Sequence, residues 1–262
     1  MHPKAFLLDM DGVLYHGDRP LAAALRFMEK LVAVPHAFLT NNPILPPEQV
    51  ADKLERMGFR RPESHLIVTS AEATADWLAA EKPDFRYFAV GAEGLPIALR
   101  KKGREDAEKA DFVVVGEGAG LEYASLTTGI NLILKRGARL VVTNPDANVD
   151  ATVDGEHRIL PGGGALVAPF AAATGQEPVI IGKPEPLLYR MALARLGFEP
   201  GDCLMIGDRP DTDIAGAARL GMPTAMVRTG RFAPGEPWPS ALPAPDIDVD
   251  DLDALAGLID WP

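Results

Sequence analysis

Residues 5–14 read AFLLDMDGVL, and this decapeptide indicates the fold more strongly than any other stretch of the chain. The apolar run at 5–8 predicts a short buried strand that delivers Asp9 and Asp11 at its end. Because side chains alternate along a strand with a period of two, both carboxylates lean toward one side. Two carboxylates that close repel each other unless a cation offsets their charge or a phosphate-transfer reaction requires them. Gly12 permits the sharp exit that a strand leading into such a site requires.

The DMDG segment on its own is also compatible with a turn or a calcium loop. Asp and Gly gather at turns because they form local hydrogen bonds there, so an ordinary turn accounts for it as well. The D-x-D-G pattern also begins calcium loops of the EF-hand type, which need a glutamate at the twelfth position. Counted from Asp9, the twelfth residue is Pro20, which excludes that loop. The turn and a reactive site both stay open at this point.

The composition bounds the class of protein. The chain has 262 residues, enough for one large domain or two moderate ones. Its net charge of -11 argues against a nucleic-acid partner, which would need clustered Lys and Arg. One cysteine, Cys203, allows no intrachain disulfide and fits a cytoplasmic location. No stretch approaches the roughly 18–20 apolar residues of a membrane span, and the N-terminus lacks the apolar core of a signal peptide, so we expect no membrane partner.

Short apolar runs alternate with helix-period segments along the chain. This alternation predicts an α/β fold, with a parallel sheet covered by helices. Thr69-x-x-Glu72 has the form of a capping box, and Pro47 is typical of a helix start. The expected strands are residues 5–8, 37–40, 87–90, 112–115, 140–143, 179–181, 204–206, 224–227 and 246–249.

The middle third of the chain reads as a second β–α unit inserted into the first. We place its boundaries near 81–83 and 176–178. This gives a core of residues 1–80 and 178–262 and an inserted α/β domain of residues 81–177.

Polar residues follow several of the apolar runs, at the strand ends where active sites form in this architecture. Thr40 offers a hydroxyl and a backbone N–H, although a helix N-cap or a turn also explains it. Lys183 follows an apolar run, where an unpaired charge is costly, although an exposed loop lysine is the alternative. Asp208 ends another strand, and acidic residues at a helix start account for Asp211 or Asp213 but not for Asp208. Three aspartates within six positions suit Mg²⁺.

Four segments of the chain, taken in sequence order, resemble the four motifs of the haloacid-dehalogenase-like (HAD) phosphohydrolases. They are DMDGVL, AFLTNNP, VIIGKPEP and GDRPDTD, and the resemblance spans nearly the whole chain. The stretches VVVGEG, VVTNPDA and PGGGALVAPFAAATG are similar to the NagD-like branch, which includes 4-nitrophenylphosphatases and pyridoxal or phosphoglycolate phosphatases. The resemblance implies a Rossmann-like, doubly wound parallel sheet as the core. It also implies a type IIA α/β cap at 81–177 that selects the substrate.

The resemblance implies a magnesium-dependent phosphomonoesterase that acts on small phosphorylated metabolites, such as sugar phosphates or nucleoside monophosphates. Asp9 would be the nucleophile and form an aspartyl-phosphate. Asp11 would protonate the leaving oxygen and then activate water. Thr40, Asn41 and Lys183 would bind the transferred phosphoryl group.

The remaining roles concern the metal and the cap. Mg²⁺ would sit on Asp9, Asp208 and the backbone carbonyl of Asp11. Asp213, with Asp211 as the alternative, would orient a water on the metal. Relatives are often dimeric through the cap, so the resemblance also allows a homodimer. Three residues would position the loop or face the substrate, namely Asn42, Asn144 and Asp146.

Four other classes of protein share parts of this pattern. A receiver domain of two-component signalling shares Asp, Thr and Lys but lacks the late GDRPDTD segment and the insert. A dehalogenase would leave Asp11 without a leaving oxygen to protonate. A phosphomutase on the same core stays open. So does a non-catalytic protein that binds a phosphorylated ligand, although all the required side chains are present.

Overall fold

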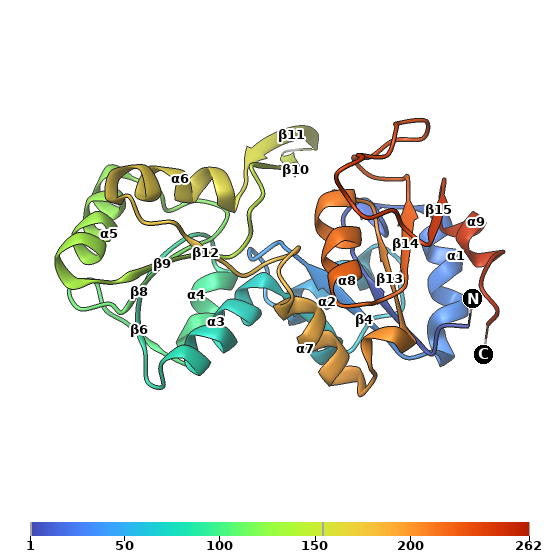
Figure 1. Cartoon of the computed structure of the whole chain (residues 1–262), viewed down its shortest axis with the longest axis horizontal. Helices are drawn as coiled ribbons and strands as arrows, with labels where there is room; N and C mark the ends of the chain where they lie inside the picture. The colour runs from blue at the N-terminus through green and yellow to red at the C-terminus, as the bar shows by residue number, and fades with distance from the viewer. Residues whose placement is uncertain (1, 154, 262) are drawn as a thin grey trace. The chain divides into compact units, whose positions relative to one another are not determined.

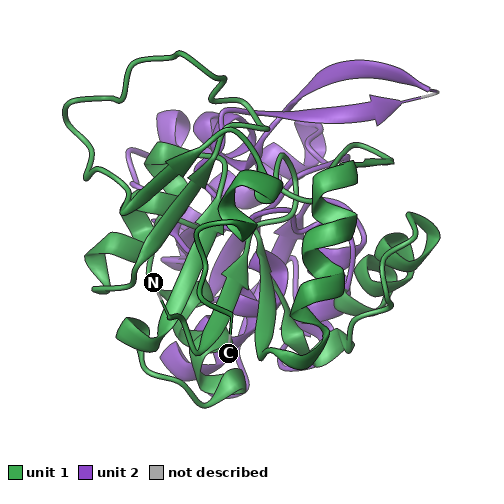
Figure 2. Cartoon of the chain, turned by 90° about the vertical axis from the view of Figure 1, so that its right-hand side faces the viewer, with its two compact units in different colours: residues 1–40, 47–68, 183–262 green, residues 41–46, 69–182 purple. Residues whose placement is uncertain are grey.

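The computed structural model describes residues 2–153 and 155–261. The chain divides into two compact units, which Figure 2 shows in different colours. Unit 1 comprises residues 1–40, 47–68 and 183–262, and unit 2 comprises residues 41–46 and 69–182. Among the described residues, no helix combines the length and the apolar character that crossing a membrane requires.

Unit 1 is built around a six-stranded sheet in the order β15-β14-β13-β1-β4-β5. The pairings of β1 with β13 and β4, and of β14 with β13 and β15, are parallel. The chain order reverses at β1, because β4 lies on one side of it and β13 on the other. Open parallel sheets bind ligands at such a switch point, beyond the carboxyl ends of the strands. The strands are β1 (Ala5–Leu8), β4 (His36–Thr40), β5 (Ile67–Thr69), β13 (Cys203–Gly207), β14 (Thr224–Val227) and β15 (Ile247–Val249).

Helices cover both faces of this sheet. In Figure 1, α1 and α9 lie on one side of the strands and α8 lies on the other. Helix α1 packs against α9, and α7 packs on β4 and β1. The doubly wound parallel sheet predicted from the sequence is therefore confirmed. The helices are α1 (Ala22–Lys30), α2 (Pro47–Arg56), α7 (Leu187–Leu196), α8 (Ala215–Arg219) and α9 (Leu252–Ala256).

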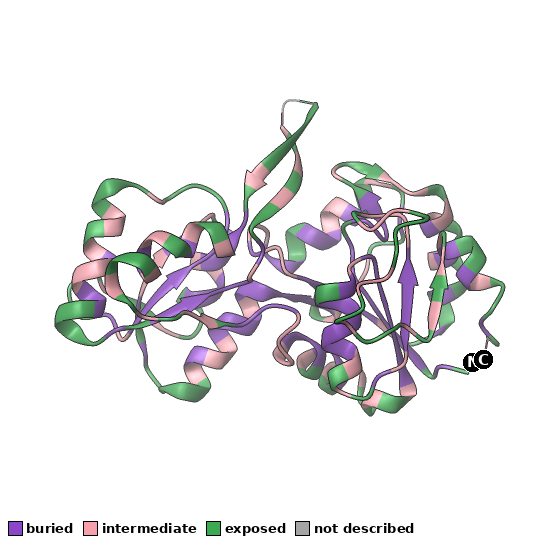
Figure 3. Ribbon diagram, turned by 45° about the horizontal axis from the view of Figure 1, so that its top comes forward, coloured by how far each residue is buried: buried purple, intermediate pink, exposed green. Residues whose placement is uncertain are grey.

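Unit 2 has a parallel five-stranded sheet of its own, in the order β12-β9-β8-β6-β7. Its core packs Val113 of β8 with Leu132 of α5 and Phe170 of α6. Figure 3 shows the central strands of both units as buried. The strands are β6 (Arg86–Val90), β7 (Arg104–Glu105), β8 (Phe112–Val115), β9 (Arg139–Val142) and β12 (Val179–Ile180). The helices are α3 (Ser70–Glu81), α4 (Gly94–Arg100), α5 (Tyr123–Arg136) and α6 (Gly163–Thr174).

Helix α3 belongs to unit 2, whereas the bounds expected from the sequence placed residues up to 80 in the core. The predicted cap at its start is present, because Thr69 Oγ1 accepts a hydrogen bond from the backbone N–H of Glu72 at 3.2 Å. Helix α3 packs against α4, which lies in the same unit. Unit 2 therefore takes residues 69–80, together with 41–46 and 178–182, from the segments that the sequence pattern assigned to the core.

Two antiparallel hairpins have no counterpart among the expected strands. One pairs β2 (Tyr15–His16) with β3 (Arg19–Pro20) in unit 1, directly after the DMDG segment. The other pairs β10 (Asn148–Val153) with β11 (Glu156–Pro161) in unit 2. The Asp-Gly pair at 154–155 is a typical hairpin signal and would have indicated the second one.

Candidate active site

Asp9 stands directly after β1, at the switch point of the unit 1 sheet. Its backbone N–H donates to the carbonyl of Ile206 at 2.9 Å, which continues the pairing of β1 with β13 by one residue. The side chain is buried. Gly12 follows with a φ of +81°, and a Cβ at this position would collide with the Asp208 carboxylate. The glycine therefore lets the chain turn left-handed while it passes close to a second acidic side chain.

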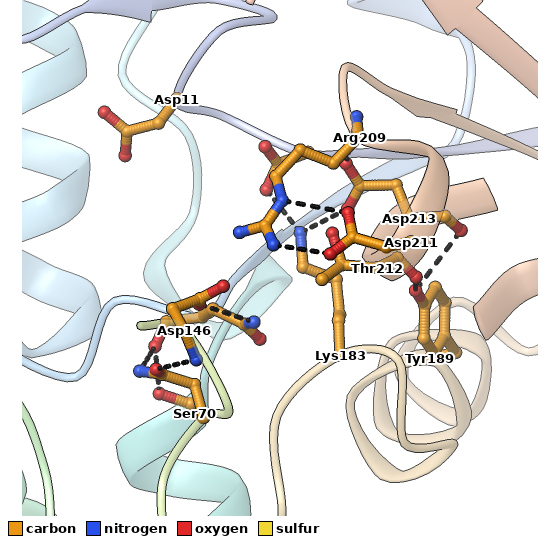
Figure 4. A network of polar contacts seen from close by, with 12 residues as sticks. Asp11, Ser70, Asp146, Lys183, Tyr189, Arg209, Asp211, Thr212 and Asp213 are labelled. Atoms are coloured by element: carbon orange, nitrogen blue, oxygen red, sulfur yellow. Dashed lines mark hydrogen bonds and ion pairs between the residues drawn. The ribbon is translucent and has the colours of Figure 1, made fainter. Parts of the chain in front are cut away.

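Lys183 joins two of the acidic residues. Its Nζ lies 2.5 Å from Asp9 Oδ1 and 2.6 Å from Asp213 Oδ1, and its side chain is only 3% exposed. Figure 4 shows the contact of Lys183 with Asp213. Burial alone would lower the lysine pKa, but the carboxylates of Asp213 and Asp9 more than offset this and raise it above its ordinary value. Lys183 is therefore a permanent cation beside Asp9.

Asp208 follows β13 and is the least satisfied carboxylate of this group. Its Oδ2 accepts a hydrogen bond from the backbone N–H of Arg231 at 3.2 Å. Its Oδ1 is buried and has no hydrogen-bond partner among the described residues. Burial, with the nearby charges of Asp9 and Asp213, raises the pKa of Asp208 well above its ordinary value. A buried carboxylate oxygen needs a hydrogen-bond donor or a cation, so an oxygen without a donor is available to bind a cation.

The three carboxylates form one cluster. Oxygen atoms of Asp9, Asp208 and Asp213 all lie within 4.8 Å of one another. Asp213 is already engaged, because its Oδ1 binds Lys183 and its Oδ2 accepts from the backbone N–H of Arg209 at 3.1 Å. Hard oxygen donors of this kind fit Mg²⁺, which binds few carboxylates and keeps several waters.

Asp11 lies outside this cluster. Figure 4 shows its carboxylate turned away from the group around Lys183. Tyr15 Oη donates to Asp11 Oδ2 at 3.3 Å. Desolvation by the surrounding atoms raises the pKa of Asp11 above its ordinary value, and the charge of Lys53 partly opposes this shift. Part of the residue is nevertheless exposed to solvent. Asp11 is thus suited to exchange a proton.

Thr40 and Asn41 are neighbours in the chain but belong to different units. Thr40 ends β4 in unit 1 and is buried. Asn41 belongs to unit 2, where its Nδ2 donates to Asp146 Oδ2 at 3.0 Å. Asn42 Oδ1 accepts from the backbone N–H of Ile44 at 2.8 Å, which closes a short turn.

Asn144 is fully buried in unit 2, and its side-chain amide is engaged there. Its Nδ2 donates to the carbonyl of Asn41 at 2.8 Å and to Glu117 Oε1 at 2.7 Å. Its Oδ1 accepts from the backbone N–H of Asp146 at 3.1 Å. The structure therefore brings Asp9, Asp208 and Asp213 together near Lys183 in unit 1, and Asn41 and Asp146 together around Asn144 in unit 2. Asp11 lies outside both groups.

Two residues that support these groups were not predicted from the sequence. Tyr189 of α7 donates from its hydroxyl to the carbonyls of Thr212 at 2.8 Å and Asp213 at 3.3 Å, and no sequence signal marks it. Glu117 carries the carboxylate that binds Asn144. It is a polar residue just after the apolar strand β8, so the rule that found Asp208 would also have found Glu117.

Comparison with known proteins places these features in a family. A model described as haloacid dehalogenase-like hydrolase matches residues 6–105, and a HAD-hydrolase-like model matches residues 180–255. An acid sugar phosphatase of Staphylococcus saprophyticus is 38% identical over 231 residues, which cover 87% of this chain and 87% of that protein.

Solved structures agree with this placement. A thermostable NPPase double mutant from Geobacillus stearothermophilus matches with a TM-score of 0.86 and 32% identity, covering 100% of this chain and 99% of that one. NagD from E. coli K-12 matches with a TM-score of 0.84 and 27% identity, covering 96% and 98%. Glycerol phosphate phosphatase Rv1692 from Mycobacterium tuberculosis, in complex with magnesium, matches with a TM-score of 0.84 and 32% identity, covering 97% and 77%.

Proposed function

The chain belongs to the haloacid dehalogenase-like hydrolase family, in its NagD-like branch, and from this premise we propose that it is a Mg²⁺-dependent phosphatase of small phosphorylated metabolites, sugar phosphates among them. The observation that carries the proposal is the cluster of the Asp9, Asp208 and Asp213 carboxylates. Two of them, Asp9 and Asp213, pair with the ammonium of Lys183. Such a cluster can hold a cation and a phosphoryl group next to a carboxylate nucleophile.

The first step would be attack by Asp9 on the phosphorus of a monoester. A bond forms between a carboxylate oxygen of Asp9 and phosphorus, and the bond from phosphorus to the ester oxygen breaks. Asp11 gives its proton to the departing oxygen, so the alcohol leaves neutral. Its raised pKa supports this role, because a protonated carboxyl is then more populated near neutral pH.

The second step would hydrolyse the aspartyl-phosphate. Asp11, now ionised, takes a proton from water as the water oxygen attacks phosphorus, and Asp9 leaves as a carboxylate. Lys183 would bind the phosphoryl oxygens, with the Thr40 hydroxyl and the Asn41 backbone N–H as further donors. Fixed donors of this kind stabilise charge without reorganising during the reaction.

The residues that would hold Mg²⁺ are Asp9, Asp208 and the backbone carbonyl of Asp11. The unpartnered Oδ1 of Asp208 supports this assignment. Bound Mg²⁺ supplies positive charge that lets an anionic nucleophile approach an anionic phosphate. Asp213 would orient water next to the metal, while it holds Lys183 in place.

We further propose that unit 1 is the catalytic core and that unit 2 is the cap that selects the substrate. In unit 2, Asn42, Asn144 and Asp146 would position the loop or face the substrate. The names of the related acid sugar phosphatase and glycerol phosphate phosphatase support a phosphorylated sugar or polyol as the substrate class. A cytoplasmic location and a homodimer through unit 2 stay predictions.

The test is release of inorganic phosphate from a panel of phosphomonoesters, with and without Mg²⁺. The proposal predicts metal-dependent release that is lost in Asp9→Asn. Transfer of the phosphoryl group to another position of a sugar, without release, would instead indicate a phosphomutase. No turnover of any phosphomonoester by folded, Mg²⁺-loaded protein would contradict the proposal.

A further inference from the structure

The segment 41–46, directly after Thr40, forms several hydrogen bonds with the rest of unit 2. The carbonyl of Asn41 accepts hydrogen bonds from Asn144 Nδ2 at 2.8 Å and from Ser70 Oγ at 2.5 Å. The carbonyl of Ile44 accepts from the backbone N–H of Gly94 at 2.8 Å. Because Asn41 is held at both its carbonyl and its side chain, its backbone keeps one orientation.

Asn144 can hold Asn41 only if its amide nitrogen faces that carbonyl. One N–H of Asn144 binds the Asn41 carbonyl and the other binds Glu117 Oε1. A carboxylate is an acceptor only, so Glu117 favours the amide nitrogen and repels the amide oxygen. Glu117, together with the Asp146 backbone N–H that donates to Asn144 Oδ1, therefore selects the one orientation of Asn144 in which the Asn41 carbonyl also receives a donor.

Close backbone packing fixes the other side of Asn144. Residues Asn144–Asp146 run against the three glycines at the start of α6, where a Cβ at Gly163 would lie 2.8 Å from the Asn144 carbonyl oxygen and 2.9 Å from its Oδ1. Asn144 thus has little room to move away. A shift of its amide would have to come from rotation of the side chain, which Glu117 opposes.

Burial of the Glu117 side chain at this position carries a desolvation penalty. The residue is 1% exposed, and a carboxylate withdrawn from water destabilises a fold unless its partners compensate. An apolar side chain after β8 would avoid that penalty. A buried carboxylate here is best explained by a demand for its acceptor oxygen.

We propose that Glu117 is a positioning residue for phosphate binding, which acts through Asn144 to fix Asn41. The proposal rests on the proposed function, in which the backbone N–H of Asn41 binds the phosphoryl group. Glu117 and Asn144 do not touch the substrate in this scheme. They set the direction of a donor that does.

The test compares Glu117→Leu, which has similar volume but no acceptor, with Glu117→Gln, which keeps an acceptor oxygen. The readouts are KM, kcat and the inhibition constant for inorganic phosphate. We expect Glu117→Leu to raise KM and that inhibition constant by about tenfold or more. Glu117→Gln should stay within about threefold of wild type. Glu177→Leu, an exposed glutamate of unit 2, is the matched control and should match wild type.

A double-mutant cycle asks whether Glu117 acts through Asn144. In an Asn144→Ala background, Glu117→Leu should change KM and the phosphate inhibition constant by less than about twofold. Full multiplication of the two effects would overturn the proposed route. If Glu117→Leu does not fold, Glu117→Met replaces it, because the flexible thioether fills the same space without a strong acceptor.

Amide hydrogen exchange supplies a readout that does not depend on activity. Exchange of the backbone N–H groups of residues 41–46 should be faster in Glu117→Leu than in Glu117→Gln or wild type. Equal exchange and equal kinetics in the Leu and Gln variants would overturn the inference while wild-type phosphatase activity stands. Absence of activity in wild type would count against the proposed function alone, since the exchange experiment still reports the anchoring of the segment.

Discussion

Lys183 donates from its buried ammonium to Asp9 Oδ1 across 2.5 Å, although the two residues lie 174 positions apart in the chain. Asp9 follows strand β1 and Lys183 follows β12, so the pair forms only when folding brings these two distant segments of the chain together. A buried ion pair of this kind is costly to desolvate and is weak evidence for stability. Its value lies in placing a cation beside the proposed nucleophile.

Asp9→Asn should abolish turnover and leave the fold intact. The amide cannot act as an anionic nucleophile, so kcat should fall by at least about a thousandfold. Phosphate release measures the loss, and circular dichroism checks the fold. Asp52→Asn, at a half-buried aspartate of α2 paired with Arg61, is the control and should keep wild-type kcat. Retained turnover in Asp9→Asn would remove Asp9 from the nucleophile role.

Lys183→Met should destabilise the protein as well as inactivate it. Removal of the ammonium leaves the buried carboxylates of Asp9 and Asp213 without their cation. Breaking a buried ion pair from one side lowers the free energy of unfolding by about 3–5 kcal/mol. Lys4→Met, at an exposed pair with Asp202, should lower it by less than about 1 kcal/mol. Urea unfolding compares the two, and equal losses would contradict the prediction.

Asp208→Asn should weaken Mg²⁺ binding. A ligand that binds only the folded state raises the melting temperature by mass action, so Mg²⁺ should stabilise the wild-type protein. Asp208→Asn should need at least about tenfold more Mg²⁺ for the same shift, because it loses a charged oxygen donor. Asp211→Asn, whose carboxylate pairs with Arg209 outside the cluster, should respond to Mg²⁺ as wild type does. An unchanged Mg²⁺ response in Asp208→Asn would place the metal elsewhere.

In the absence of metal, the stability of the protein should fall as the pH rises toward neutral. Burial raises the pKa of Asp9 from 3.8 to about 7, with Lys183 opposing and Asp213 adding to the shift. Between about pH 4 and pH 7 the folded state therefore binds more protons than the unfolded state. The contribution of Asp9 is fully present below about pH 4 and is lost as the pH rises through about 7.

Asp9→Asn isolates this effect, because the amide does not titrate. Chemical unfolding in the presence of EDTA, between about pH 5 and pH 8, should give a steeper loss of stability for wild type than for Asp9→Asn. At the upper end of this range the variant should be the more stable of the two. Parallel pH profiles would contradict the raised pKa.

Local patterns in the sequence predicted the principal elements because their signals are short-range. Buried apolar runs gave the strands around Asp9 and Asp208, and Thr69 caps its helix as its spacing with Glu72 indicated. The hairpin of β10 and β11 was missed because most of its residues are exposed and no buried apolar run marks it. Its sequence signals are weaker ones, namely the alternation of Val149, Ala151 and Val153 with polar residues and the Asp-Gly pair at 154–155.

The sequence by itself determined the parallel fold and which acidic and basic residues stand at strand ends, because hydrophobic periodicity and chain order are local properties. Only the tertiary structure decided how those residues are used. Asp208 keeps an oxygen without a partner among the described residues while Asp213 is bound by Lys183, and Asn41 is fastened to unit 2 through Asn144. These differences depend on which groups from distant segments reach each oxygen, and packing alone sets that.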